Sequence, residues 1–164
     1  MSDEQPPQTN PQTDPHSDPH SDPRDLRRSD FGEHRTVALR WADTDRYGHV
    51  NNAVHYELMD TAVNAWLWET NGLTPEALDA VGVVVETGMG YFAEIHFPGS
   101  VELGLRIEKV GRSSVRYRCG IFLPGVEEPA GVGHFQQVYI DKRTRRPVPV
   151  PEEVRRVLGP ITVS

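Results

Sequence analysis

Cysteine is almost absent from this chain of 164 residues, and its scarcity excludes several kinds of site. Cys119 is the only cysteine, so a single chain has neither an internal disulfide nor a thiolate zinc site. Cys119 also lies in a strand-like apolar pattern, which indicates a core position. The Gly-x-Ser-x-Gly sequence of many serine hydrolases is missing as well. A cysteine or serine nucleophile is therefore not expected.

Long apolar runs and basic stripes are also missing. No stretch approaches the roughly 20 apolar residues that span a bilayer, and the polar start lacks the apolar core of a signal peptide. We therefore expect a cytoplasmic protein with no membrane partner. Lys and Arg number 17 against 24 Asp and Glu, without a basic stripe that carries interleaved aromatics. We accordingly expect no nucleic-acid partner.

The first 30 residues lack the apolar side chains that a core needs. Only Met1 and Leu26 are clearly apolar, while six of the 14 prolines and seven acidic residues fall here. We predict a disordered tail over residues 1–30, rich in Pro, Asp, His and Ser, followed by one domain over residues 31–164. Two histidines in a repeated Pro-His-Ser-Asp sequence are too few to indicate a metal site.

After the tail the sequence shows first a strand pattern and then a helical one. Apolar residues at every second position over residues 35–41, ending at Trp41, predict a half-buried strand. A helical period covers residues 52–70, and Gly72 supplies a left-handed stop. This helix is amphipathic and carries few charges, so we expect it to lie against a sheet.

Four further segments alternate apolar and polar residues and supply that sheet. They cover about residues 83–97, 101–107, 115–123 and 132–141. Short turns rich in Gly, Pro and Ser separate them, which predicts an antiparallel meander. The order of elements favours an α+β fold in which a sheet wraps one long central helix. A proline-rich strap at residues 147–151 and a short helix at 152–158 are expected to follow.

The residues that can do chemistry are densest where the predicted strand meets the helix. The sequence of residues 43–54 is Asp-Thr-Asp-Arg-Tyr-Gly-His-Val-Asn-Asn-Ala-Val. Gly48 permits a sharp turn, and Asn51 or Asn52 can cap the helix. An acidic side chain, Asp45, is therefore expected beside the free amides of a helix start.

This motif resembles that of the hotdog-fold acyl-CoA thioesterases of the 4-hydroxybenzoyl-CoA thioesterase type. The resemblance extends over about residues 33–151, through Tyr91-Phe92-Ala93, Phe97-Pro98-Gly99 and residues 110–114. It implies a curved five-stranded sheet around the helix, and a homodimer or dimer of dimers with acyl-CoA at the subunit interface. It also implies that no cofactor and no metal are needed. His55 departs from the family pattern, where an aromatic or apolar residue is expected.

The resemblance also implies roles in thioester hydrolysis. Asp45 matches the catalytic carboxylate, either as a nucleophile that forms a mixed anhydride or as a base that activates water. The amide around Asn52 matches the group that polarises the thioester carbonyl. Three roles are open for His49: a general acid, a contact of the thioester, or a structural residue of the loop. On spacing alone, Asp45 has the alternative of a turn aspartate that only satisfies loop amides.

Other polar residues of the motif are assigned supporting roles. Asp43 is expected to fix the loop by hydrogen bonds, and Asn51 to cap the helix beside the substrate. Glu57 would be the carboxylate of a related active-site arrangement and is less favoured. The acidic and imidazole side chains of the motif match no established metal-site spacing (Asp43, Asp45, His49 and His55).

Two groups outside the motif are candidate substrate contacts. Tyr91 and Phe92 are expected to line the acyl pocket, with a position in the core as the alternative. Arg112, Ser113 and Ser114 offer a guanidinium and hydroxyls for CoA phosphates, unless this turn is an ordinary exposed hairpin. A second basic cluster has the same two interpretations (Arg143, Arg145 and Arg146). The sequence leaves the acyl group open.

The leading hypothesis is therefore an acyl-CoA thioesterase that releases a free acid and CoA. The alternative is a non-hydrolytic hotdog protein that binds acyl-CoA as a sensor or assembly partner, but such a protein has no need for Asp45. A hotdog dehydratase would require a histidine and an acid placed for proton transfer. His49 is the only nearby histidine candidate, and it lacks the expected surroundings.

Overall fold

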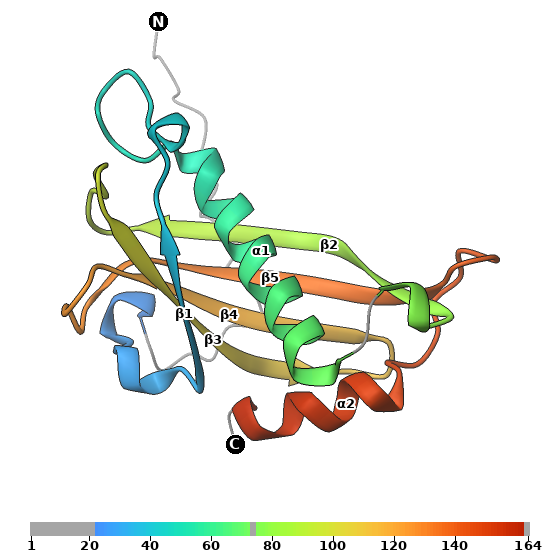
Figure 1. Cartoon of the computed structure of the whole chain (residues 1–164). Coiled ribbons are helices and arrows are strands. Elements are labelled where there is room, and N and C mark those ends of the chain that lie inside the picture. Colours follow the sequence, from blue (N-terminus) through green and yellow to red (C-terminus); the bar gives the residue numbers. More distant parts are fainter. Residues whose placement is uncertain (1–21, 73–74, 163–164) are drawn as a thin grey trace, which may run out of the picture.

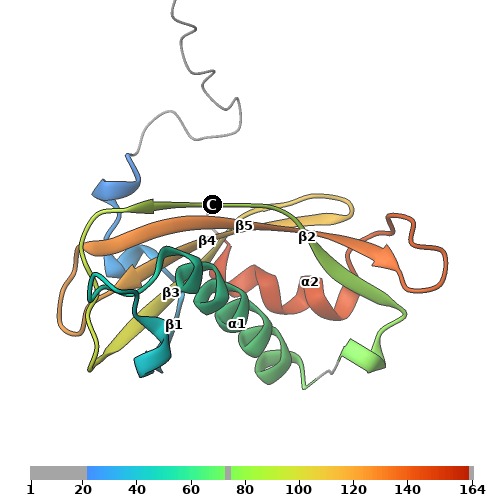
Figure 2. The ribbon, with the colours of Figure 1, turned by 90° about the horizontal axis from the view of Figure 1, so that it is seen from above.

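A computed structural model describes residues 22–72 and 75–162 of the chain. The strands are β1 (Glu33–Ala38), β2 (Ala80–Tyr91), β3 (Ser100–Val110), β4 (Ser114–Phe122) and β5 (Pro129–Asp141), and the helices are α1 (Asn52–Asn71) and α2 (Glu152–Leu158). Short 3-10 turns cover Pro23–Asp25, Arg28–Asp30, Trp41–Asp43, Pro75–Ala77 and Gly159–Ile161. The five strands form one antiparallel sheet that curves around α1 (Figures 1 and 2). The predicted α+β hotdog architecture is confirmed.

Helix α1 has the ends and the buried face that its sequence predicts. The Asn51 side chain accepts a hydrogen bond from the Ala53 N–H at the start, and Gly72 ends the helix with φ 64°. Met59 and Val63 are fully buried against the sheet. None of the helices in the described residues is both long and apolar enough to cross a membrane.

The sheet order corrects the predicted meander. The order is β1-β3-β4-β5-β2, with every neighbouring pair antiparallel. Strands β3, β4 and β5 do form a meander, but β2 pairs with β5 instead of β3. The reason is that β2 ends at Tyr91, and residues 92–99 form a connection that crosses the end of the sheet near the start of α1. The Val50 N–H donates to the Ile95 carbonyl (2.8 Å) in this connection.

The strand predicted over residues 35–41 is also too long. Strand β1 ends at Ala38, and Trp41 is 78% exposed in a 3-10 turn rather than on a buried strand face. The Asp43 carboxylate accepts a hydrogen bond from the Arg40 N–H (2.6 Å), which closes the turn in place of another strand pair. Cys119 does lie in the core as predicted, and burial raises the pKa of its thiol to about 12.

The segment before β1 corrects the expected tail boundary at residue 30. Residues 23–30 form two 3-10 turns on the face of the sheet opposite α1 (Figure 2). Leu26 and Phe31 are buried there with Phe122 and Val132. The burial of these side chains holds residues 22–30 against the sheet, which their polar composition does not predict. Residues 1–21, for which disorder is predicted and which contain the two histidines of the repeat, lie outside the described residues.

Candidate active site

The motif forms a tight hairpin that carries Asp45 on one arm and leads into the start of α1 on the other. The Asn51 N–H donates to the Asp43 carbonyl (2.8 Å), and the Asp45 N–H donates to the His49 carbonyl (2.9 Å). Gly48, with φ 85°, makes the turn, and its N–H donates to the Asp45 carbonyl (3.1 Å). Asp45 and the helix start are therefore held on the two arms of one hydrogen-bonded hairpin.

The Asp45 side chain is anchored through one of its two oxygens. Oδ1 accepts a hydrogen bond from the Tyr47 N–H (2.8 Å) and a longer one from the His49 N–H (3.4 Å). Within the described residues, Oδ2 has no hydrogen-bond donor. The residue is half-buried, and Oδ2 is not one of the buried side-chain atoms that lack a hydrogen-bond partner. Asp45 is thus a turn aspartate that keeps one oxygen available for chemistry.

The start of α1 leaves one amide available on the other arm of the same hairpin. The Asn51 side chain accepts from the Ala53 N–H (2.9 Å), and the Asn51 carbonyl accepts from the Val54 N–H (2.9 Å). In the part of the chain that the structure describes, the Asn52 N–H has no acceptor. It lies at the positive end of the helix dipole, where a developing negative charge is stabilised. Asn51 is a helix cap as predicted.

Asp43 is buried and fixes the hairpin, as expected from the sequence. Its carboxylate accepts from the Arg40 N–H and also from the guanidinium at Nε (2.9 Å) and Nη2 (2.7 Å). The hydrogen bonds from Arg40 lower the pKa of Asp43 below its ordinary value of 3.8, against the opposing effect of burial. Arg40 also pairs with Glu57 (3.1 Å), so Glu57 is held away from Asp45 in a surface ion pair.

We expect Asp43→Asn to lower the free energy of unfolding by about 1–3 kcal/mol at pH 7, because the Arg40 donors lose a charged acceptor. The lowered pKa means that the stabilisation is fully present above the ordinary pKa of 3.8 and is lost as the pH falls through the pKa of the folded state. Urea unfolding at pH 7, 5 and 3 measures this. A difference between parent and variant that persists unchanged at pH 3 would contradict the assignment.

Tyr91 and His55 contact the helix start. The Tyr91 hydroxyl donates to the Asn52 carbonyl (3.3 Å), and its ring packs edge-on against His55 at 5.0 Å. Burial, followed by the hydrogen bond with Tyr56, raises the pKa of Tyr91 to about 12. Burial lowers the pKa of His55, whose Nδ1 donates to the Asn51 carbonyl (3.1 Å). The structure thus places Tyr91 at the site and adds His55, a neutral ring at neutral pH.

The sequence contains a signal for the contact of His55 with the helix cap, although the motif alone does not suggest it. Residues four apart on a helix lie one above the other, so a histidine four residues after Asn51 can reach the carbonyl of the cap residue. The imidazole is buried here, in the place where the family pattern has an aromatic or apolar residue, and its hydrogen bond to the Asn51 carbonyl satisfies Nδ1.

His49 faces two residues that the sequence analysis did not consider. Its Nε2 lies 3.3 Å from Glu94 Oε2, and His96 Nε2 lies 3.5 Å from the same oxygen. Glu94 and His96 belong to the connection of residues 92–99. His96 Nδ1 donates to the Gly48 carbonyl (3.0 Å), which ties this connection to the motif hairpin.

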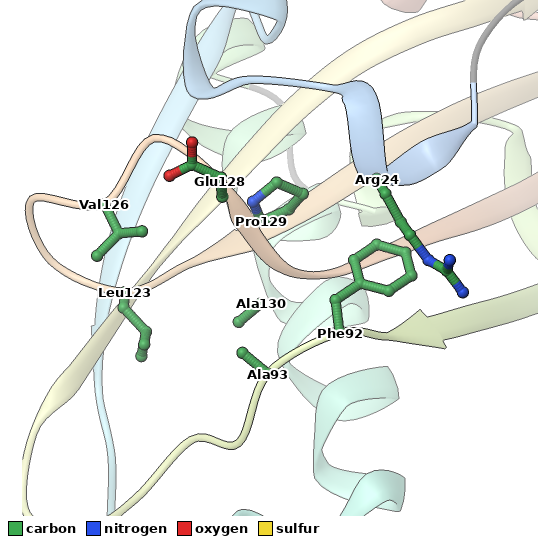
Figure 3. Close-up of a pocket in the computed structure, with 8 residues that line it drawn as sticks. All are labelled: Arg24, Phe92, Ala93, Leu123, Val126, Glu128, Pro129 and Ala130. Carbon is green, nitrogen blue, oxygen red and sulfur yellow. The ribbon is translucent and has the colours of Figure 1, made fainter.

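Phe92 is not brought to this site, although it follows Tyr91 directly. It packs against the cluster of Leu26, Phe31, Phe122 and Val132, and the Arg24 guanidinium lies 5.7 Å from its ring centre. Phe92 and Arg24 line a pocket of about 290 Å³. Figure 3 shows them with the other lining residues, Ala93, Leu123, Val126, Glu128, Pro129 and Ala130. Successive strand residues point to opposite faces, and this alternation separates Phe92 from the helix start.

Arg112, Ser113 and Ser114 lie at the opposite end of the sheet from the motif. The motif follows β1, whose Ala38 pairs with Ser100 at one end of β3, while the turn of residues 111–113 follows the other end (Figure 1). A strand of this length spans about 35 Å. The Arg112 carbonyl accepts from the Val150 N–H (2.8 Å). One chain therefore does not bring this turn to Asp45.

The comparisons with known proteins agree with the fold. The model of the thioesterase-like superfamily matches residues 39–158. The PA5185 protein from Pseudomonas aeruginosa strain PAO1 is 39% identical with a TM-score of 0.81, over 85% of this chain and 97% of that one. None of the curated proteins is significantly similar to the chain in sequence.

Two more distant structures show the same fold. The 1,4-dihydroxy-2-naphthoyl-CoA thioesterase Slr0204 from Synechocystis is 17% identical, with a TM-score of 0.71 over 77% of this chain and 94% of that one. The gentisyl-coenzyme A thioesterase BH1999 is 22% identical, with a TM-score of 0.68 over 77% and 99%. Because the family model covers most of the folded residues, the chain belongs to the thioesterase-like superfamily and has the hotdog fold.

Proposed function

We propose that this protein hydrolyses an acyl-CoA thioester to a free acid and CoA. The observation that carries the proposal is that a single hairpin carries both an Asp45 carboxylate oxygen without a hydrogen-bond donor and the Asn52 amide without an acceptor, among the described residues. Membership of the thioesterase-like superfamily supports it, as do the names of the two distant thioesterases that share the fold.

Each of the two groups meets one need of the reaction. Thioester cleavage needs an oxygen nucleophile at the carbonyl carbon and a donor for the negative charge that develops on the carbonyl oxygen. Asp45 either attacks to give a mixed anhydride, which water then cleaves, or removes a proton from the attacking water. The Asn52 N–H donates to the carbonyl oxygen, and the C–S bond breaks to release CoA. We assign His49, which pairs with Glu94, a positioning role in the hairpin.

Release of free CoA thiol from a panel of short, long and aromatic acyl-CoAs tests the proposed activity. We expect turnover of at least one member, and the panel identifies the acyl class. The aromatic members are included because both distant thioesterases act on aromatic acyl-CoAs, according to their names. Acyl-CoA binding without turnover would replace the proposal with the non-hydrolytic binding protein.

We further propose that the chain acts as a homodimer joined through the free edge of β2. This strand is at the end of the sheet order and is long, and its Val84 and Val85 are 44% and 55% exposed. An open edge with exposed apolar residues is typical of a strand that pairs with another chain. Arg112, Ser113 and Ser114 then contribute to CoA binding if the second chain brings this turn to the site.

Val85→Lys should weaken the dimer by at least about tenfold, because a twofold interface places both new charges close together. Light scattering over a range of protein concentrations measures the dissociation. The matched control is Val126→Lys, which changes an exposed valine in the β4–β5 loop and should leave the dimer intact. Equal dissociation of both variants would rule out β2 as the interface.

A further inference from the structure

We propose that His49, Glu94 and His96 form a binding site for a divalent cation of the zinc class. Among the described residues these three are the one group of His, Cys, Asp or Glu side chains whose ligand atoms all lie within 4.8 Å of one another. Both imidazole Nε2 atoms approach the same carboxylate oxygen, at 3.3 Å and 3.5 Å. The thioester chemistry proposed above uses none of these three side chains as a reacting group.

Two of the three separations between the ligand atoms match the geometry of a bound metal. Zinc binds histidine nitrogen and carboxylate oxygen at about 2.0–2.1 Å, and two such bonds at a tetrahedral angle separate their ligand atoms by about 3.3–3.4 Å. The separations of 3.3 Å and 3.5 Å between the imidazoles and the carboxylate agree with this value, and the third separation, between the two imidazole nitrogens, is at most 4.8 Å. A small rotation of the imidazole side chains would let one cation contact both imidazoles and the carboxylate, and a water molecule would complete four ligands.

The hydrogen bond of His96 indicates which of its nitrogens faces the cation. A carbonyl oxygen only accepts, so the bond to the Gly48 carbonyl requires the proton to be on Nδ1. In the neutral ring Nε2 then carries a lone pair, and that lone pair faces Glu94 Oε2. A cation between these two atoms would be bound by both of them. A backbone carbonyl that orients a ligand histidine in this way is a common feature of metal sites.

The site is built by two segments that are already tied together. His49 comes from the motif hairpin, whereas Glu94 and His96 come from the connection of residues 92–99. The Val50 N–H donates to the Ile95 carbonyl (2.8 Å), so the backbones on both sides are fixed before any metal binds. Two imidazoles with one carboxylate favour zinc and similar transition metals over Mg²⁺ and Ca²⁺, which prefer oxygen ligands.

The competing occupant of the same space is a proton, which would make the cluster a simple imidazolium and carboxylate ion pair. Binding of a metal distinguishes the two. Zinc competition against a chromophoric chelator, and the absorption spectrum of the Co²⁺-loaded protein, both report on the site without any need for turnover. A failure of hydrolysis therefore leaves this test intact.

The test uses the full chain in which His16→Ala and His20→Ala remove the histidines of the first 21 residues. We expect one equivalent of Zn²⁺ to bind to it. His96→Ala and Glu94→Gln in the same background should each lower the affinity by at least about tenfold. The control is His34→Ala, because His34 pairs with one glutamate, Glu102, at 2.8 Å and has no second histidine beside it.

Two results would overturn the proposal. One is the loss of Zn²⁺ binding in the His16→Ala and His20→Ala background, which would assign the metal to the N-terminal residues. The other is an equal affinity of the His96→Ala, Glu94→Gln and His34→Ala proteins, or a Co²⁺ spectrum that these substitutions leave unchanged.

Discussion

Asp45→Asn is expected to lower kcat/KM for acyl-CoA hydrolysis by about a hundredfold or more. The amide oxygen of the new side chain can still accept the hydrogen bond from the Tyr47 N–H that holds Asp45 Oδ1. It can neither attack a carbonyl carbon nor remove a proton from water at a useful rate. The hairpin therefore keeps its shape while the reacting group is lost, so the loss should fall on kcat with KM little changed.

Asp79→Asn is the matched control for this substitution. Asp79 is an exposed aspartate just before β2, and its contact with Lys142 is made by its backbone carbonyl. The same chemical change should leave kcat/KM within about twofold, since exposed positions of this kind tolerate substitution. Thermal unfolding of both variants checks that the fold is preserved. A parent-like rate for the Asp45→Asn protein would remove Asp45 from the mechanism.

Phe31→Ala is expected to cause the largest loss of stability, about 3–5 kcal/mol in the free energy of unfolding. Phe31 is buried and packs edge-on against Phe122 with ring centres 5.4 Å apart. Its ring lies over the paired glycines Gly104 and Gly120, where an added Cβ would come within 2.8 Å of it. The ring thus fills a hollow in the outer face of the sheet, and removing it leaves a cavity.

Urea unfolding measures this loss, and the control comes from the same N-terminal segment. Asp25 is exposed in the first 3-10 turn, so Asp25→Ala should change the free energy of unfolding by less than about 0.5 kcal/mol. If Phe31→Ala cost no more than Asp25→Ala, the segment of residues 22–31 would not be an integral part of the fold.

The features that the sequence predicts well are set by residues that are close to one another in the sequence. The cap at Asn51 and the stop at Gly72 are set by backbone conformations that few residue types adopt, and both are found as predicted. Apolar periodicity likewise places α1 and its buried residues. The hairpin that carries Asp45 has the same local origin, because Gly48 makes the turn and the carboxylate binds amides two and four residues ahead.

The features that the sequence does not predict depend on contacts between distant segments. Leu26 lies in a polar segment, and only the hollow beside Phe122 explains its burial. Trp41 continues an apolar alternation, yet the Arg40 and Asp43 pair ends the strand before it. Glu94 and His96 are separated from His49 by more than 40 residues, so no short spacing could reveal that the three side chains meet.

The most direct test of the proposed role of Asp45 is the rate of thioester cleavage in a single turnover, with protein in excess over the acyl-CoA that the parent hydrolyses fastest. This measurement isolates bond cleavage from product release. We predict that the Asp45→Asn protein binds this acyl-CoA as the parent does but cleaves it at least about a hundredfold more slowly. Cleavage by the variant at the parent rate would contradict the assignment of the reaction to Asp45.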